Sequence, residues 1–164
     1  MYNIYWLTGL PCSGKSTIAN GIKSHIRQCE ILNGDEIRNK ISNVGFSRDA
    51  RSRHMLYVAY MANRLSSYAD VIVDLVSPLR DVRDKIKSNY KNVFEIYVKC
   101  DIDICEVRDV KGHYKKASEG EILDFTGVQS EYEIPLVPDL EIDTSILSID
   151  DCVNQIITSI NIKN

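Results

Sequence analysis

The sequence predicts an α/β fold, in which a central parallel β-sheet is flanked by helices on both faces. Short apolar runs that are typical of buried strands alternate with segments whose apolar residues recur at helical spacing. The chain has 164 residues, the size of one ordinary domain, and it contains no internal repeat, low-complexity tract or linker. We therefore expect residues 1–164 to form a single three-layer domain.

Five apolar runs are the predicted strands. The first ends close to Gly9, the second is closed by Asn33-Gly34, and the third stops at Ser77-Pro78, all of which are turn residues. Runs without alternating polar residues indicate strands that are buried on both faces, as in a parallel sheet. The predicted strands comprise residues 4–7, 30–32, 71–76, 93–98 and 140–142.

Helical spacing marks the segments between these runs. A charged helix is expected after Pro78, and a final helix is expected from Ser148, where Asp151 three residues on fits a variant of the capping box. Two helices before Pro78 and the final helix have apolar stripes. In chain order, these stripes are Ile18, Ile22, Ile26 and Cys29; Met55, Ala59, Ala62 and Leu65; and Ile149, Val153, Ile156, Ile157 and Ile160.

The composition argues against several classes of function. A net charge of −3 offers no basic surface for a nucleic-acid partner. No apolar run approaches the roughly 20 residues of a membrane span, and the first residues lack the positive region of a signal peptide. The five cysteines are odd in number and form no C-x-x-C pair, which is typical of reduced thiols. We expect a cytoplasmic protein without a membrane partner.

Residues 9–16, Gly-Leu-Pro-Cys-Ser-Gly-Lys-Ser, match the phosphate-binding pattern G-x-x-x-x-G-K-S between a predicted strand and a predicted helix. Gly9 and Gly14 let the backbone curl so that its N–H groups converge on phosphate oxygens. Lys15 is expected to reach the β- and γ-phosphates, and Ser16 to ligate magnesium. The pattern therefore predicts binding of a nucleoside triphosphate with Mg²⁺.

Four neighbouring residues, Pro11, Cys12, Ser13 and Thr17, complete the expected ATP contacts. A thiol at a helix N-terminus can have a lowered pKa, so Cys12 is a candidate reactive cysteine. The simpler interpretation is that Cys12 is a small residue that fits the loop.

Phosphate binding alone leaves several enzyme classes open. A GTPase needs a guanine-binding N-K-x-D motif, and the only Asn-Lys pair is followed by Ile41-Ser42. A transporter ATPase or a helicase would need a longer chain. A small kinase is the remaining enzyme class, and its rival is a non-catalytic nucleotide-binding subunit.

Asp35 is the candidate catalytic acid. It follows the second predicted strand, at the edge of the sheet where ligands collect. An aspartate there can order magnesium-bound waters or accept the proton of an acceptor hydroxyl. The alternative is that Asp35 is the N-cap of a helix beginning at Glu36, which does not exclude the catalytic role.

Further motifs are spread in order over nearly the whole chain. They comprise residues 9–17, 33–38, 45–47 with Arg51, 77–78, 105–117, 120–122, 125–127, 132–133 and 142–144. Together they resemble the adenylyl-sulfate kinase family of P-loop kinases. That family phosphorylates the ribose 3′-hydroxyl of a nucleotide whose 5′-phosphate carries a sulfate. The resemblance implies a mobile lid at about residues 109–127, ATP with Mg²⁺, and a homodimer.

The resemblance also assigns roles to residues. Asp35 becomes the catalytic and magnesium-associated acid, and Arg38 and Arg51 become contacts to the acceptor's anionic groups. Phe46 and Phe125 would sandwich its base, since an aromatic face suits any base.

Four further assignments complete the set. His54 and Ser77 belong to the implied acceptor site, and Arg108 and Lys111 belong to the implied ATP site, Lys111 within the lid.

Departures from the family pattern cluster on the acceptor side. The family's Asp-Gly-Asp begins here with Asn33, and an asparagine that contacts the substrate is replaced by His54. Leu56 and Leu123 stand at two cationic positions. One lost hydrogen bond to a charged group costs about 1.5–3 kcal/mol, so these changes predict a different acceptor for the same reaction.

Cytidine diphosphoramidate, an intermediate of bacterial capsule biosynthesis, is the acceptor that the departures favour. It has a ribose 3′-hydroxyl, a base and a 5′ mixed anhydride, and its terminal amine could donate a hydrogen bond to a neutral His54. Adenylyl sulfate is the alternative acceptor.

Overall fold

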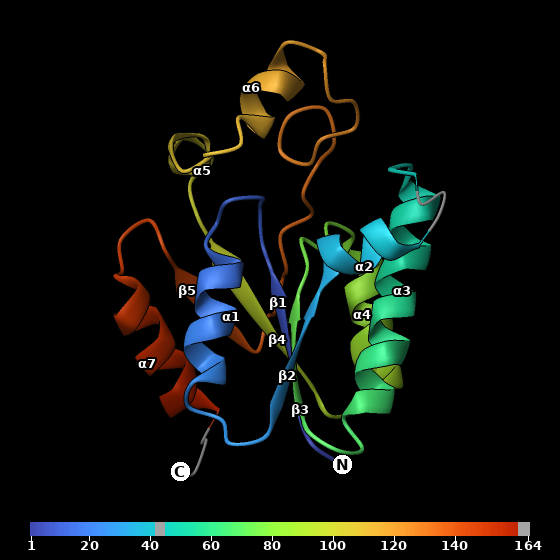
Figure 1. The fold of residues 1–164 in the computed structure, drawn as a ribbon, viewed down its shortest axis with the longest axis vertical. Coiled ribbons are helices and arrows are strands. Elements are labelled where there is room, and N and C mark those ends of the chain that lie inside the picture. The colour runs from blue at the N-terminus through green and yellow to red at the C-terminus, as the bar shows by residue number, and fades with distance from the viewer. Residues whose placement is uncertain (42–44, 161–164) are drawn as a thin grey trace.

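Five parallel strands form one sheet that lies between two layers of helices in the computed structural model, which describes residues 1–41 and 45–160 (Figure 1). The order of the strands in the sheet is β2-β3-β1-β4-β5. The predicted α/β fold with a parallel sheet is therefore confirmed. The strands are β1 (Ile4–Thr8), β2 (Cys29–Asn33), β3 (Asp70–Asp74), β4 (Val93–Lys99) and β5 (Leu140–Asp143).

The helices connect successive strands or follow the last one. Of these, α1 and α7 cover one face of the sheet, α3 and α4 cover the other, and α5 and α6 lie above the carboxyl edge of the strands (Figure 1). The helices are α1 (Lys15–Lys23), α2 (Gly34–Lys40), α3 (Arg48–Leu65), α4 (Arg80–Asn89), α5 (Ile102–Val107), α6 (His113–Ser118) and α7 (Ile149–Ser159).

The central strand β1 pairs with β3 on one side and with β4 on the other. The chain first builds β2 and β3 on one side of β1 and then crosses to build β4 and β5 on the other. The strand order therefore switches at β1, and ligands of open α/β sheets bind at the carboxyl ends of the strands beside such a switch.

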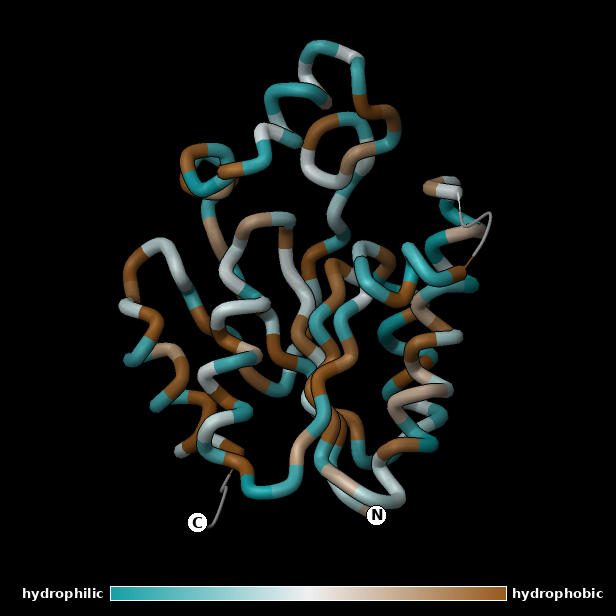
Figure 2. The backbone as a smooth tube through the Cα atoms, in the orientation of Figure 1, coloured by the Kyte–Doolittle hydropathy of each residue, from teal (hydrophilic) through white to brown (hydrophobic). Residues whose placement is uncertain are grey.

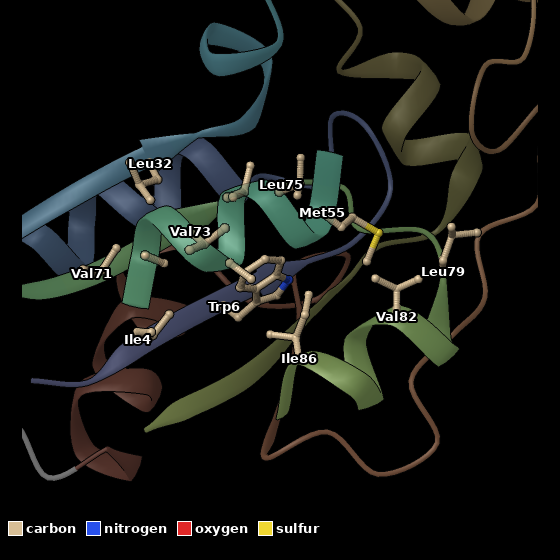
Figure 3. Packing of buried hydrophobic residues seen from close by; sticks show 13 residues of the cluster. Ile4, Trp6, Leu32, Met55, Val71, Val73, Leu75, Leu79, Val82 and Ile86 are labelled. Carbon is tan, nitrogen blue, oxygen red and sulfur yellow. The ribbon is translucent and has the colours of Figure 1, made fainter. Parts of the chain in front are cut away.

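Each face of the sheet has its own apolar core. Between the sheet and helices α3 and α4, the indole of Trp6 packs with Ile4, Val73 and Ile86 (Figure 3). On the other face, Leu7 and Ile72 pack against α1 and α7. Figure 2 shows the strands as mostly hydrophobic and the tops of the loops as largely polar. The core thus fixes the strand ends that carry the polar side chains.

The structure differs from the sequence prediction by more than one residue at two element boundaries. Helix α1 ends at Lys23, so Ile26 lies beyond it and Cys29 lies in β2. Both side chains still pack in the apolar core between the sheet and helices α1 and α7, which explains why they matched helical spacing. Strand β3 ends at Asp74 rather than at residue 76.

Two local features of the helices complete the comparison. The capping box of α7 is confirmed, since Ser148 Oγ accepts from the N–H of Asp151 at 3.1 Å. The segment predicted as a lid contains helix α6. None of the helices in the described part of the chain has the length and hydropathy to span a membrane.

Candidate active site

The phosphate-binding loop connects β1 to α1 at the centre of the carboxyl edge. Gly14 is the N-cap residue of α1 with φ of 100°, a left-handed conformation that favours glycine. A Cβ atom at Gly9 would lie 2.3 Å from the carbonyl oxygen of Val98 in β4, so only glycine fits there. The loop is therefore packed tightly against the neighbouring strand, with the amide groups of its helix end available for phosphate.

Lys15, the first residue of α1, has its ammonium group inside this loop. Its Nζ donates to the carbonyl oxygens of Gly9 at 3.0 Å and Leu10 at 2.7 Å. Burial lowers the pKa of Lys15, while the carboxylates of Asp74 and then Asp35 act in the opposite direction. This arrangement keeps a cation where the terminal phosphates of a nucleotide would lie.

A second cluster lies beside the loop, at the ends of β2 and β3. Ser16 Oγ donates to Asp74 Oδ2 at 2.6 Å, and Asn33 Nδ2 donates to the same oxygen at 2.9 Å. The sequence analysis missed Asp74 because it placed this residue inside a buried strand. An acidic residue at the carboxyl end of a strand next to a phosphate-binding loop was the signal that could have identified it.

The donors in this cluster fit magnesium. Mg²⁺ prefers oxygen ligands and is usually held by one or two carboxylates together with substrate phosphates. Ser16 offers a hydroxyl, and Asp74 and Asp35 offer carboxylates. Among the described residues, no three His, Cys, Asp or Glu side chains gather into a site that could hold a metal ion.

Asp35 lies in the first turn of α2 with an exposed side chain. The N-cap of α2 is Asn33, whose Oδ1 accepts from the N–H groups of Asp35 and Glu36, each at 3.0 Å. The interpretation of Asp35 as the N-cap residue is therefore wrong. Within the described residues its carboxylate accepts no hydrogen bond, so it is available for chemistry.

Two arginines lie against the ring of Phe46. The Cζ atoms of Arg38 and Arg51 are 4.8 Å and 5.7 Å from the centre of its ring, which remains 51% exposed. Arg51 also donates through Nε to the carbonyl of Phe46 at 2.7 Å. The three predicted acceptor residues thus lie together, but only Phe46 is exposed: Arg38 is half-buried and Arg51 is 9% exposed. Arg38 also donates to the carbonyl of Gly45 at 2.9 Å.

Arg51 connects Phe46 to the end of the lid. Its guanidinium donates to Thr126 Oγ1 at 2.6 Å and to the carbonyl of Asp124. Phe125 lies between these two residues in sequence and meets the ring of Tyr114 edge-on at 5.0 Å. Arg51 therefore contacts the segments that carry both predicted base-stacking residues.

His54 and Ser77 are buried rather than exposed on the acceptor side. Ser77 Oγ accepts from Trp6 Nε1 at 2.9 Å, so its hydroxyl is engaged by the core. His54 Nε2 lies 3.1 Å from the carbonyl of Gly34, while its Nδ1 is buried with no partner among the described residues. Burial, followed by the charge of Arg38, lowers the pKa of His54, so the ring is neutral.

The lid is tied to the phosphate-binding loop at two points. Tyr114 of α6 donates its hydroxyl to the carbonyl of Pro11 at 2.9 Å. Arg108 donates to Thr144 Oγ1 at 3.1 Å, and Thr144 Oγ1 in turn donates to the carbonyl of Ser13 at 2.8 Å. Of the other predicted ATP contacts, Lys111 is exposed on the lid and Thr17 is exposed on α1.

Cys12 has the properties of a structural residue. Burial and the neighbouring Asp109 raise the pKa of its thiol, and Lys15 lowers it by less. The lowered pKa expected of a thiol at a helix N-terminus is therefore not found at Cys12, which fits better as a small residue of the loop.

Arg83 is a buried residue whose contacts were not predicted from the sequence. Its side chain, 1% exposed, pairs through Nε with Glu95 Oε1 at 2.8 Å. Its two remaining nitrogens donate to the carbonyls of Ser77 and Glu133. Arg83 therefore joins the loop after β3 to the segment that follows the lid.

An open cavity of about 600 Å³ lies between the end of β4 and the segment after the lid. Leu10, Tyr97 and Tyr132 are among the residues that line it. None of the residues predicted for ATP, magnesium or the acceptor lines this cavity.

Known proteins share both the sequence and this architecture. The adenylylsulphate kinase family model matches residues 2–143. An adenylyl-sulfate kinase of Rippkaea orientalis is 38% identical over 92% of this chain and 87% of its own length. One of Prochlorococcus marinus is 41% identical over 96% of this chain and 82% of its own length.

A solved structure of the Mycobacterium tuberculosis APS kinase in complex with AMPPNP and APS is similar to the whole fold. It superposes with a TM-score of 0.89 at 31% identity, and 98% of each chain is covered. The sequence and fold comparisons therefore agree, and the chain belongs to the adenylyl-sulfate kinase family.

Proposed function

We propose that this kinase transfers the γ-phosphate of ATP to the ribose 3′-hydroxyl of a 5′-modified nucleotide, with adenylyl sulfate as its acceptor. The observation that carries the proposal is the cluster at the carboxyl edge of the sheet. Lys15 and Ser16 of the phosphate-binding loop lie beside the carboxylate of Asp74, and Ser16 contacts it directly. The relatives favour adenylyl sulfate, which the sequence analysis ranks second.

Each residue has a defined task in this reaction. Lys15 stabilises the charge that develops on the transferred phosphoryl group, because a fixed cation in a dry site costs no reorganisation. Asp35 accepts the proton of the 3′-hydroxyl as that oxygen attacks phosphorus. Mg²⁺, held by Ser16 and a neighbouring carboxylate, would supply positive charge that offsets the negative charge developing on the transferred phosphoryl group.

The acceptor is held by charge and by stacking. Arg38 and Arg51 bind its anionic 5′ groups and thereby orient the 3′-hydroxyl towards ATP. Phe46, with its exposed ring, stacks on one face of the base, and Phe125 on the other. Arg108, just before the lid, and Lys111, within it, contact ATP. We also propose that the protein is a cytoplasmic homodimer. Size-exclusion chromatography with light scattering tests whether it is a dimer.

Cytidine diphosphoramidate is a second candidate acceptor because of His54. Its ring is neutral, and with Nε2–H donated to Gly34, the buried Nδ1 remains an acceptor without a partner. A sulfate at neutral pH has no proton to donate to that nitrogen, whereas a phosphoramidate has N–H groups. An unsatisfied buried acceptor is costly. Because His54 is 3% exposed, a 5′ donor would reach Nδ1 only if the acceptor side opened around the ring when the nucleotide binds.

The two acceptors are distinguished by measuring ADP release with each one at equal ATP and magnesium. We expect a higher kcat/KM for adenylyl sulfate. A preference of about tenfold or more for cytidine diphosphoramidate, lost in His54→Phe, would instead establish the second candidate. ATP binding without turnover on either nucleotide would support the non-catalytic subunit.

A further inference from the structure

We propose that Asp74 is the carboxylate that anchors magnesium in this kinase, that Asn33 orients it, and that Asp35 serves the acceptor hydroxyl instead of the metal. The inference rests on the proposed function and refines it. It differs from the role that the family resemblance implies, in which Asp35 is the magnesium-associated acid.

The positions of Asn33 and Asp74 are fixed by the sheet. They are the last residues of β2 and β3 and are paired partners in the parallel register. Both strand ends face the phosphate-binding loop, and the Oδ2 atom of Asp74 accepts from Ser16 Oγ as well as from Asn33 Nδ2. The hydroxyl that is expected to ligate magnesium is therefore already in contact with this carboxylate.

The second oxygen of Asp74 is available. Within the described residues, Oδ1 accepts no hydrogen bond, and Asp74 forms no ion pair, although the residue is only 6% exposed. This nearly buried carboxylate is hydrogen-bonded only by a hydroxyl and an amide, and Lys15 acts on it from beyond the distance of an ion pair. A divalent cation beside Ser16 would supply a closer positive charge.

Asp35 lacks these properties. Its side chain is exposed in the first turn of α2, and no hydrogen bond joins it to Ser16. Asp74, in contrast, contacts Ser16 of the phosphate-binding loop directly through Oδ2. The two acids thus have separate environments, one facing the loop and the other facing solvent on α2.

The amide of Asn33 sets the charge of the cluster. An aspartate at position 33 would place a second carboxylate in the place of an amide that lies 2.9 Å from Asp74 Oδ2. Two carboxylates at that distance repel each other, so the strand pair carries a single negative charge. A protein with Asp at position 33 and Asn at position 74 would keep one negative charge in this strand pair, on β2 instead of β3.

The test measures the binding of AMPPNP to the full chain by calorimetry, once with MgCl₂ and once with EDTA. The readout is the factor by which magnesium tightens binding, and no acceptor is needed. We expect Asp74→Asn to reduce this factor by roughly tenfold or more, the equivalent of one charge-assisted contact, with little change in the Kd measured in EDTA. Asp35→Asn should keep the factor and lose turnover.

Three further variants sharpen the result. Asp84→Asn removes an exposed carboxylate from α4 and should behave as wild type. Asn33→Asp should weaken folding or magnesium binding through repulsion, and the double variant Asn33→Asp/Asp74→Asn should recover most of the magnesium effect. The double variant also keeps the test informative if Asp74→Asn does not fold.

Two results would overturn the inference. One is an unchanged magnesium effect in folded Asp74→Asn, and the other is its loss in Asp35→Asn. Binding is measured without an acceptor, so a wrong acceptor assignment would leave the expected magnesium effects unchanged. A wrong assignment of Asp74 would appear in the binding data even if adenylyl sulfate supports turnover.

Discussion

The hydroxyl of Tyr114 donates a 2.9 Å hydrogen bond to the carbonyl oxygen of Pro11 and so joins helix α6 directly to the phosphate-binding loop. The Tyr114 side chain is buried, and its ring packs edge-on against Phe125. One side chain therefore contacts both the loop expected to bind ATP and the lid residue expected to stack on the acceptor.

Tyr114→Phe should separate these two contacts, because it keeps the ring and removes the hydroxyl. We expect the KM for ATP to rise about threefold to tenfold and the free energy of unfolding to fall by about 1 kcal/mol, as for one neutral hydrogen bond. Steady-state kinetics and urea unfolding measure both. Tyr68→Phe, at a position that is 70% exposed, is the matched control. An unchanged KM would show that this bond does not connect the lid to ATP binding.

Lys15→Met should abolish most turnover while the fold remains. The variant keeps the length of the side chain but loses the cation that stabilises the transferred phosphoryl group, so kcat/KM should fall at least about a hundredfold. Thermal unfolding should change little, because burial already disfavours the charged form of Lys15. Lys23→Met removes an exposed charge from the last turn of the same helix and should retain activity. Wild-type turnover in Lys15→Met would refute the loop assignment.

His54 should make stability depend on pH. Burial lowers its pKa in the folded protein below the ordinary value of 6.5, so the unfolded chain binds a proton at a higher pH than the folded one. The stabilising contribution of neutral His54 is therefore present above about pH 6.5 and is lost as the pH falls through and below that value.

The measurement is the Tm at pH 7.5 and at pH 5.5, values chosen to bracket the ordinary pKa of about 6.5. We expect a smaller difference between the two in His54→Gln than in wild type. His25→Gln, at an exposed position, should behave as wild type. Equal pH dependence in all three proteins would contradict a buried neutral His54.

The sequence predicts the sheet and the loop well because both depend on local patterns. Apolar runs that end at turn residues mark the strands, and the spacing of Gly9, Gly14 and Lys15 is set by the chemistry of phosphate binding. The capping box at Ser148 is local as well, since donor and acceptor are three residues apart.

The parts that could not be predicted depend on partners distant in sequence. Asp74 matches a strand pattern, and its importance emerges only when Asn33 and Ser16 are brought to it by the parallel register. At the start of α2, Asn33 and Asp35 are both residue types that cap helices, so sequence alone could not decide between them. The backbone geometry selects Asn33.

The contacts of Arg83 constrain how parts of this kinase could be exchanged with those of relatives. Because one buried guanidinium binds the carbonyls of Ser77 and Glu133, the loop after β3 and the segment after the lid are fastened to the same point. Glu95 of β4 holds that guanidinium from a third segment. A chimera that imports a foreign lid should therefore end the imported segment before the position of Glu133. Otherwise it must also import the residues that stand at the positions of Arg83 and Glu95.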